Sequence, residues 1–189
     1  MKELSLHILD IVQNSITAKA TFIQIIIEEN EKENFINIKI IDNGIGMNKD
    51  LLEKVINPFV TTRKTRKVGL GISLFKAAAE RCNGRFYIQS ELGKGTEIFA
   101  SFERDHIDRA PLGNMVDTII TIIMANEKID YVYKHTFNEC EFIFDTREIR
   151  KVLGGMPLND VAVIDWMKNY IIDGIKELYK NKEIKNQPK

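Results

Sequence analysis

The strongest constraint on the fold comes from two neighbouring runs rich in β-branched residues, TFIQIIIEE at 21–29 and NFINIKIIDNG at 34–44. Runs of this length and composition predict strands, and the short polar stretch between them predicts a hairpin. The preceding segment, LSLHILDIVQNSITAKA, carries apolar residues at helical spacing. We therefore predict an amphipathic helix followed by an antiparallel pair of strands.

The next segments extend this order. KDLLEKVI predicts a short helix that ends before Asn57-Pro58, because the residue ahead of a proline disfavours helical geometry. TTRKTRKVGLG predicts a mobile loop, and ISLFKAAAERCNG predicts a helix closed by Gly84. Two strands, RFYIQSE and TEIFASFE, follow around the turn LGKG. The predicted class is α+β, a two-layer α/β sandwich with helices on one face of a mixed, largely antiparallel sheet.

From about residue 105 the pattern restarts with an apolar helix (MVDTIITIIMA), an aromatic hairpin (DYVYKHTF and CEFIFDT), a short helix and a long terminal helix. We predict a domain at 1–104 and a small C-terminal α+β region at 105–189. Three roles stay open for this second region. It pairs with the N-terminal sheet, binds a substrate protein, or forms a homodimer.

Composition excludes several classes of protein. The 189 residues include 27 Lys or Arg and 27 Asp or Glu, so the formal net charge is zero and neither a basic nucleic-acid arm nor an acidic tail is expected. Cys82 and Cys140 do not make a metal cluster. The N-terminus has neither a cleavable signal nor an apolar run that spans a membrane. We expect a cytoplasmic protein with one main site and no nucleic-acid or membrane partner.

Two polar groupings point to that site. Asp10 and Asn14 are four residues apart on the first predicted helix, so their side chains project from one face. In IDNGIGM, Asp42 ends a strand ahead of Gly44 and Gly46, which allow a flat ligand to approach the main chain. An Asp-Asn-Gly hairpin turn is the alternative, but a short helix follows where a second strand would be needed.

The segment VGLGIS is the third grouping. Gly69 and Gly71 precede a helix, whose free N-terminal amides are suited to phosphate. A basic run lies just ahead of these glycines and would screen the charge of a polyphosphate. Its members are Arg63, Lys64, Arg66 and Lys67.

Taken in order, these segments resemble the Bergerat-fold ATP-binding domains of histidine kinases, gyrase, the heat-shock chaperone and mismatch-repair ATPases. The similar boxes are LDIVQNSITAKA, IDNGIGM, NPFVTTRKT and VGLGISLFKAAAERCNG with its tail SELGKGTEIFASF. They cover nearly all of 1–104. The third and fourth boxes are most similar to those of sensor histidine kinases.

The resemblance implies a site for ATP and Mg²⁺. Asn14 matches the asparagine whose side-chain oxygen binds Mg²⁺. Asp42 matches the carboxylate that accepts a hydrogen bond from the adenine amino group, with Thr96 supporting that contact. Gly44 and Gly46 would border the adenine. The other implied ATP-binding residues are Phe59, Thr61, Thr62, Arg63, Lys64, Gly69, Leu70 and Gly71.

Asp10 departs from the hydrolysing members of this superfamily, in which the equivalent position is usually a Glu that acts as general base on water. The aspartate is one methylene shorter, so hydrolysis is less assured. In kinase-like members the same position can polarise the acceptor side chain. Asp10 is thus the candidate catalytic residue.

The resemblance suggests three functions. The favoured one is a kinase that transfers the γ-phosphate of ATP to a separate protein, as the anti-sigma-factor kinases do; the alternatives are an ATP-hydrolysing switch and a non-enzymatic ATP sensor. Only thirteen residues precede Asn14, so we expect no dimerisation domain with a phosphoacceptor histidine ahead of it. His7 and His135 are expected to pack in the core, and His106 is a weaker candidate acceptor.

Overall fold

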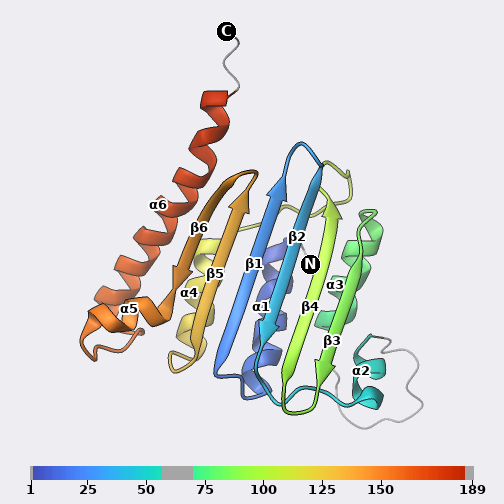
Figure 1. The fold of residues 1–189 in the computed structure, drawn as a ribbon, viewed down its shortest axis with the longest axis horizontal. Helices are drawn as coiled ribbons and strands as arrows, with labels where there is room; N and C mark the ends of the chain where they lie inside the picture. The colour runs from blue at the N-terminus through green and yellow to red at the C-terminus, as the bar shows by residue number, and fades with distance from the viewer. Residues whose placement is uncertain (1, 57–69, 186–189) are drawn as a thin grey trace.

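The computed structural model describes residues 2–56 and 70–185, with side chains described as far as residue 180. Pairs of consecutive strands are separated by one or two helices along the chain (Figure 1). The N-terminal elements are α1 (Leu4–Thr17), β1 (Phe22–Asn30), β2 (Phe35–Asp42), α2 (Lys49–Ile56), α3 (Gly71–Arg81), β3 (Phe86–Glu91) and β4 (Gly95–Glu103). The C-terminal elements are α4 (Met115–Ala125), β5 (Asp130–Phe137), β6 (Cys140–Asp145), α5 (Thr146–Leu153) and α6 (Val161–Lys185).

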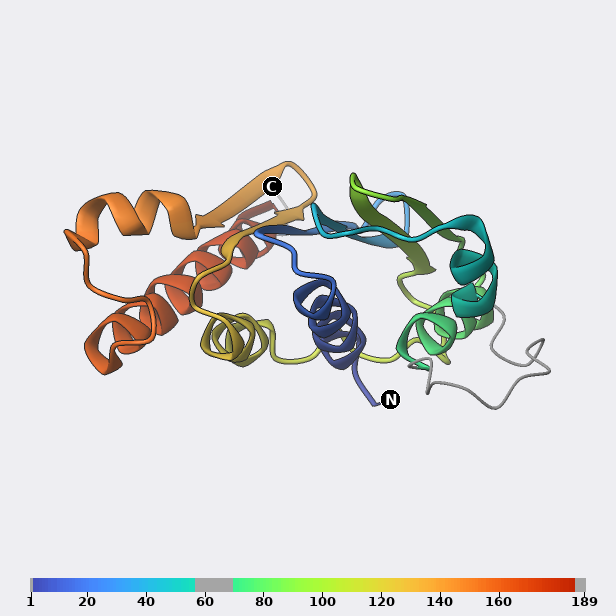
Figure 2. The same ribbon diagram turned by 90° about the horizontal axis from the view of Figure 1, so that it is seen from below.

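The six strands form one sheet in the order β3-β4-β2-β1-β5-β6. Four of the five strand pairs are antiparallel, and β1 with β5 is parallel. Helices α1, α3 and α4 lie side by side on one face of this sheet (Figure 2). The predicted two-layer sandwich with a mixed, largely antiparallel sheet is confirmed.

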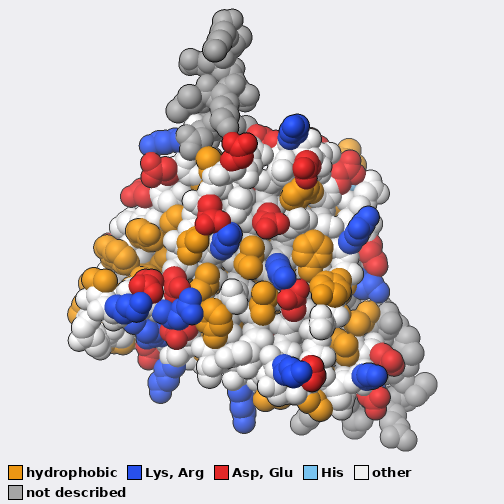
Figure 3. Space-filling view, in the orientation of Figure 1, with side chains coloured by type: hydrophobic (Ala, Val, Ile, Leu, Met, Phe, Trp, Pro, Cys, Tyr) orange, Lys and Arg blue, Asp and Glu red, His pale blue; other side chains and the backbone are white. Residues whose placement is uncertain are grey.

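Alternation along the strands decides which side chains enter the core. On β1 every second residue is buried, among them Ile23, Ile25 and Ile27, and β2 and β4 repeat the pattern. This follows from the period of two in a strand. The opposite face carries mixed hydrophobic and charged side chains (Figure 3), among them the ion pair between Lys39 and Glu97 at 2.9 Å.

The C-terminal region continues the sheet. Strand β5 pairs with β1 from Phe22↔Asp130 to Glu29↔Phe137. The segment ahead of α4 also binds the start of α1, since the amides of Leu4 and Ser5 donate to the carbonyls of Pro111 and Leu112 at 2.9 and 2.8 Å. These bonds satisfy amides that a helix start leaves unpaired. Of the three roles left open for 105–189, pairing with the N-terminal sheet is therefore observed, while the boundary near 105 stays a prediction.

A buried polar cluster fastens α6 to the sheet. Glu29 occupies an inward position near the end of β1, and its Oε1 lies 2.9 Å from Nε2 of His135. The Tyr133 hydroxyl lies 2.8 Å from Nδ1 of the same histidine, and Tyr179 of α6 donates its hydroxyl to Glu29. Burial alone would raise the pKa of the Glu29 carboxyl, but the hydrogen bonds with His135 and Tyr179 hold it below its usual value. His135 is thus a core residue, as predicted.

Replacing Tyr179 by Phe is expected to lower the free energy of unfolding by about 1–3 kcal/mol near neutral pH, because it removes a hydrogen bond to a charged group. Because the pKa of Glu29 is lower in the folded protein than in the unfolded chain, its ionised form stabilises the fold at pH values above the unfolded pKa. This contribution is lost as the pH falls through the folded pKa. The deficit of the variant should therefore shrink in acid.

Urea unfolding at about pH 7 and about pH 3.5 measures this change, since the pH values bracket the usual pKa of Glu. Tyr170→Phe is the matched control, because this tyrosine is 45% exposed on the same helix. A Tyr179→Phe deficit that is equal at both pH values would contradict the charged contact.

Candidate functional site

A cavity of about 270 Å³ lies between α1, the helices α2 and α3, and the neighbouring ends of β2 and β4. Its walls are mainly apolar. Its polar lining comes from Asn14, Ser15 and Thr17 of α1, Asp42 of β2 and Thr96 of β4. A few polar groups in a largely apolar concave surface are typical of small-molecule sites.

Asp42 is the central polar group of this cavity. Its side chain is buried, with the residue 8% exposed, and both carboxylate oxygens have partners. The Ser15 hydroxyl donates to Oδ2 at 2.6 Å, and the Gly44 amide donates to Oδ1 at 2.9 Å. A carboxylate offers about four acceptor positions, so Asp42 keeps acceptor capacity for a ligand in the cavity.

Thr96 faces Asp42 directly across the β2–β4 pair. Its hydroxyl lies 2.9 Å from that of Ser90, and the Ser90 hydroxyl donates to the Gly95 carbonyl at 2.9 Å. The Met47 amide in turn donates to the Ser90 hydroxyl at 2.8 Å. These bonds tie the loop after β2 to the end of the β3–β4 hairpin, so the cavity wall is held in place by a continuous set of contacts.

Two members of this arrangement, Ser15 and Ser90, were missed by the sequence analysis. Ser15 had a detectable signal, because it follows Asn14 and lies four residues after the apolar Ile11 on the buried face of the helix. Ser90 had none, because its place beside Thr96 depends on strand register.

The glycines of the loop after β2 are required by close packing. A Cβ on Gly44 would lie 2.7 Å from the Ala18 carbonyl oxygen. A Cβ on Gly46 would overlap the Glu91 carbonyl oxygen, and its φ of +65° disfavours other residues. Gly46 also lines the cavity. The loop can therefore pass between α1 and the β3–β4 turn only with glycine at these positions.

Asp10 and Asn14 lie one turn apart on α1, and both are exposed. Asn14 lines the cavity. Asp10 lies against the start of α3, since a Cβ on Gly71 would be 3.2 Å from Cβ of Asp10 and 3.4 Å from its Oδ2. The structure thus brings Asp10 next to Gly71, two residues that are distant in sequence. The adjacent Leu70 is 53% exposed.

The remaining predicted site residues lie outside the described residues. They are Phe59, Thr61, Thr62, Arg63, Lys64 and Gly69. Their roles stay predictions.

The other two histidines have different surroundings. His7 is buried with its ring centroid 5.4 Å from that of Phe75, and burial lowers the pKa of the imidazole, so it packs as a neutral side chain, as expected. His106 follows β4 and accepts a hydrogen bond at Nδ1 from the Asp108 amide. Because a strand rises about 3.3 Å per residue, the end of β4 lies roughly 20 Å from Thr96. His106 is therefore remote from the cavity.

Within the part of the chain that the structure describes, no three His, Cys, Asp or Glu side chains are grouped as a metal-binding cluster. Among the described helices, none combines the length and the apolarity needed to cross a lipid bilayer.

Comparison with known proteins identifies relatives of this chain. The family model of histidine kinase-, DNA gyrase B-, and HSP90-like ATPases matches residues 2–106. A putative sensor protein of Shewanella frigidimarina (strain NCIMB 400) is 36% identical over 103 residues, which are 52% of this chain and 16% of that protein. Sensor kinase CckA of Brucella abortus (strain 2308) is 36% identical over 83 residues, 41% of this chain and 9% of the kinase. The chain therefore corresponds to a small part of each relative.

Solved structures share the fold at low sequence identity. The Aquifex aeolicus MutL ATPase domain complexed with ADP has a TM-score of 0.51 and 15% identity, covering 82% of this chain and 70% of that one. The N-terminal domain of a DNA repair protein has a TM-score of 0.52 and 16% identity, covering 76% of this chain and 52% of that one. Each of these matches covers a larger part of this chain than residues 2–106 do, so the common fold extends into the C-terminal region.

Proposed function

Because the chain belongs to the family of histidine kinase-, DNA gyrase B-, and HSP90-like ATPases, we propose that the cavity at Asp42 binds the adenine of ATP. The observation that carries this proposal is the buried Asp42 carboxylate, held by Ser15 and Gly44 with acceptor capacity left over. The adenine amino group is a donor and satisfies it. A base with a carbonyl at that position would place two acceptors together and leave both unpaired.

The phosphates are proposed to extend along α1 from this cavity. Asn14 lies at the cavity wall, and its amide oxygen is a ligand type that Mg²⁺ accepts together with phosphate oxygens and water. One turn earlier, Asp10 lies beside Gly71 at the start of α3, whose first amides suit an anion. Gly69 is proposed to face the phosphates together with Gly71. The other predicted ATP-binding residues, Phe59, Thr61, Thr62, Arg63, Lys64 and Leu70, are proposed to complete the nucleotide site. When bound, Mg²⁺ would offset phosphate charge.

The reaction we propose is transfer of the γ-phosphate to a separate protein. The similarity to sensor kinases supports it, as does the position of His106 far from the cavity, which leaves the acceptor to another molecule. In this scheme Asp10 accepts a proton from the acceptor side chain. A hydrolysing switch is the second candidate, because the same exposed carboxylate beside Gly71 is placed to activate water.

Incubation with Mg²⁺ and ATP labelled at the γ-phosphate distinguishes these reactions. With pure protein we expect the label to stay on ATP, and with a cell extract we expect it to move to a second protein. Asp10→Asn should reduce this transfer at least about 100-fold, in line with loss of a general base, without weakening ATP binding. Asp173→Asn, which removes a carboxylate from α6, is the control.

The other outcomes have separate meanings. Free phosphate released by the pure protein, and lost in Asp10→Asn, would establish the hydrolysing switch instead. Label on the protein itself that His106→Ala removes would contradict transfer to a separate partner. Label that stays on bound ATP even with the extract would favour the sensor.

A further inference from the structure

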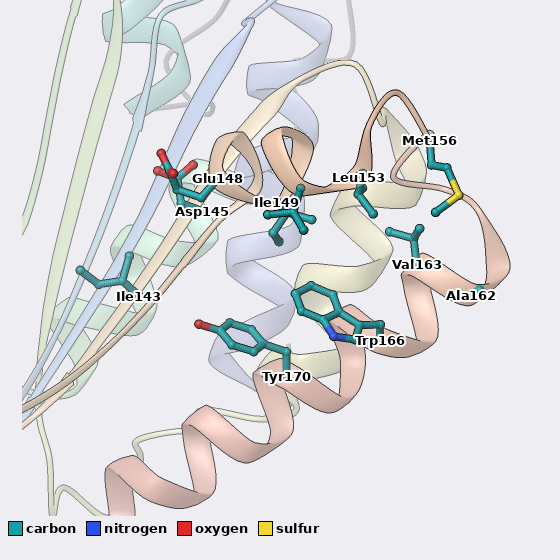
Figure 4. Close-up of a pocket in the computed structure, with 11 residues that line it drawn as sticks. Ile143, Asp145, Glu148, Ile149, Leu153, Met156, Ala162, Val163, Trp166 and Tyr170 are labelled. Carbon is teal, nitrogen blue, oxygen red and sulfur yellow. The ribbon is translucent and has the colours of Figure 1, made fainter.

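The helix α5 makes contacts on more than one side. Ile149 and Leu153, one turn apart, line an apolar groove of about 600 Å³ between α5 and α6 (Figure 4). Successive side chains of a helix point about 100° apart, so Arg150 leaves α5 in a different direction from Ile149. Arg150 extends to β5 and to the turn that precedes this strand. It therefore joins α5 to the sheet.

Three groups near the start of β5 accept hydrogen bonds from the partly buried Arg150 side chain. Its Nε donates to Oδ1 of Asp130 at 2.9 Å. Its Nη2 donates to the carbonyls of Glu127 and Ile129. The donors of a guanidinium lie in one plane with fixed directions, so several acceptors bound to it are held in one arrangement. Arg150 thus fixes the turn before β5 together with the first residue of the strand.

The first residue of β5 in turn holds the start of β1. The Asp130 amide donates to the Thr21 carbonyl at 3.0 Å, and Asp130 faces Phe22 in the parallel β1–β5 pair. A second residue of α5 reaches the same place, since Cζ of Arg147 lies 4.7 Å from the centroid of the Phe22 ring. Residues of the C-terminal region therefore bound the start of β1 on one side.

On its other side, the start of β1 is held by Asn43, the residue after Asp42. The side-chain oxygen of Asn43 accepts from the amides of Thr21 and Phe22 at 2.8 and 2.9 Å. Its NH₂ group donates to the Thr21 hydroxyl at 2.9 Å. Asn43 lies between Asp42 and Gly44, whose amide donates to the Asp42 carboxylate. A displacement at the start of β1 therefore moves the backbone that carries this carboxylate.

All of these contacts lie at one end of the sheet. β1 and β5 begin there, β2 ends there, and α5 starts there after β6 (Figure 1). Consecutive hydrogen bonds connect the Arg150 guanidinium with the loop after β2. They pass through Asp130, Thr21 and Asn43. An energetic connection along such a series is established by non-additive effects of substitutions at its two ends.

We propose that Arg150 is a positioning residue of the nucleotide site and acts on Asp42 through the three residues just named. This inference rests on the proposed function, because it concerns Asp42 as the group that binds adenine. A carboxylate that is already oriented loses less freedom when the ligand binds, which favours binding. Arg150 lies outside the part of the chain that the family model matches. The C-terminal region thus contributes to ATP binding without contacting the nucleotide.

The Gly44 amide reports the position of Asp42 in the protein free of nucleotide. Arg150→Met should make this amide exchange with deuterium at least about fivefold faster, because its acceptor is held less firmly. NMR measures the rate. Lys151→Met is the matched control, since it removes the same charge from the next position of α5, where Lys151 pairs with Glu148 of the same helix at 2.6 Å. It should leave the Gly44 amide unchanged.

Isothermal titration with ATP measures the effect on binding. Arg150→Met and Asn43→Ala should each raise the dissociation constant at least about fivefold, whereas Lys151→Met should not change it. The double variant of Asn43 and Arg150 should bind no more weakly than the weaker single variant, because both substitutions interrupt the same series of contacts. Residues that affect binding independently would give the product of the two factors.

Circular dichroism checks that the variants are folded. If Arg150→Met does not fold, Asp130→Asn replaces it in both measurements, because it removes the ion pair with Arg150 and keeps the backbone amide that donates to Thr21. Wild-type exchange of the Gly44 amide in the folded variant would overturn the inference, and so would independent effects in the double variant. A wild type that does not bind ATP would instead contradict the proposed function, whereas the Gly44 amide would still decide whether Arg150 positions Asp42.

Discussion

An Asp42→Asn variant is expected to bind ATP at least about 100-fold more weakly than the wild type, a loss of about 3 kcal/mol. The reason is a count of donors. The Ser15 hydroxyl and the Gly44 amide both donate to the Asp42 carboxylate, and the adenine amino group would be a third donor. An amide has one oxygen and turns its NH₂ group toward one of these donors, which leaves buried hydrogen-bonding groups unpaired.

Isothermal titration with ATP measures this loss, and urea unfolding checks that the variant remains folded. Ser15→Ala should weaken binding by a smaller factor, about tenfold, because Asp42 keeps its charge but loses one of the two groups that orient it. Thr17→Ala is the matched control, since Thr17 lines the same cavity but its hydroxyl donates to the Gln13 carbonyl. Preserved affinity in a folded Asp42→Asn protein would remove this cavity as the adenine site.

The second large effect is expected at Gly95, the first residue of β4. Gly95→Ala should lower the free energy of unfolding by at least about 2 kcal/mol. A Cβ at this position would overlap the Asp42 carbonyl oxygen and lie 2.8 Å from Cα of Asn43. Both contacts are with backbone, so a side-chain rotation does not relieve them and β4 must move away from β2. The φ of +101° adds the strain of a left-handed conformation.

Gly93→Ala separates these two causes. Gly93 also has a positive φ, of +78°, but a Cβ there meets no atom within 4 Å. The Gly93→Ala variant should therefore lose only about 1 kcal/mol of the free energy of unfolding, which is the cost of the unfavourable backbone conformation. Urea unfolding of both variants gives the difference, and ATP affinity should fall only in Gly95→Ala, because Asp42 is displaced. Equal losses of stability in the two variants would contradict the close contact between β4 and β2.

The sequence predicted the elements of the N-terminal part and the two-layer sandwich. Alternating isoleucines at 23–27 indicated the buried face of β1, and the apolar spacing of α1 indicated its packed side. Asn14 and Asp42 were identified because they occur in boxes whose order resembles a known family, and the structure places both at one cavity. Their roles toward ATP stay predictions.

Contacts between distant segments were not predictable in this way. The hydrogen bond from Ser15 to Asp42 joins residues 27 positions apart, and the pairing of Ser90 with Thr96 depends on register. Asp10 meets Gly71 only because α1 and α3 pack side by side. The glycines Gly44 and Gly46 were predicted to let a ligand approach the main chain, and in the structure they also let neighbouring backbone approach.

The sequence by itself determined which segments form helices and strands and in what order the polar boxes follow one another, because periodicity and spacing are properties of the chain alone. Only the tertiary structure decided that β5 extends the N-terminal sheet in parallel with β1 and that an apolar groove stays open between α5 and α6. The physical reason is that β1 and β5 pair across more than a hundred residues, as with Phe22 and Asp130, and that local patterns carry no information about which strands pair or how closely two helices pack.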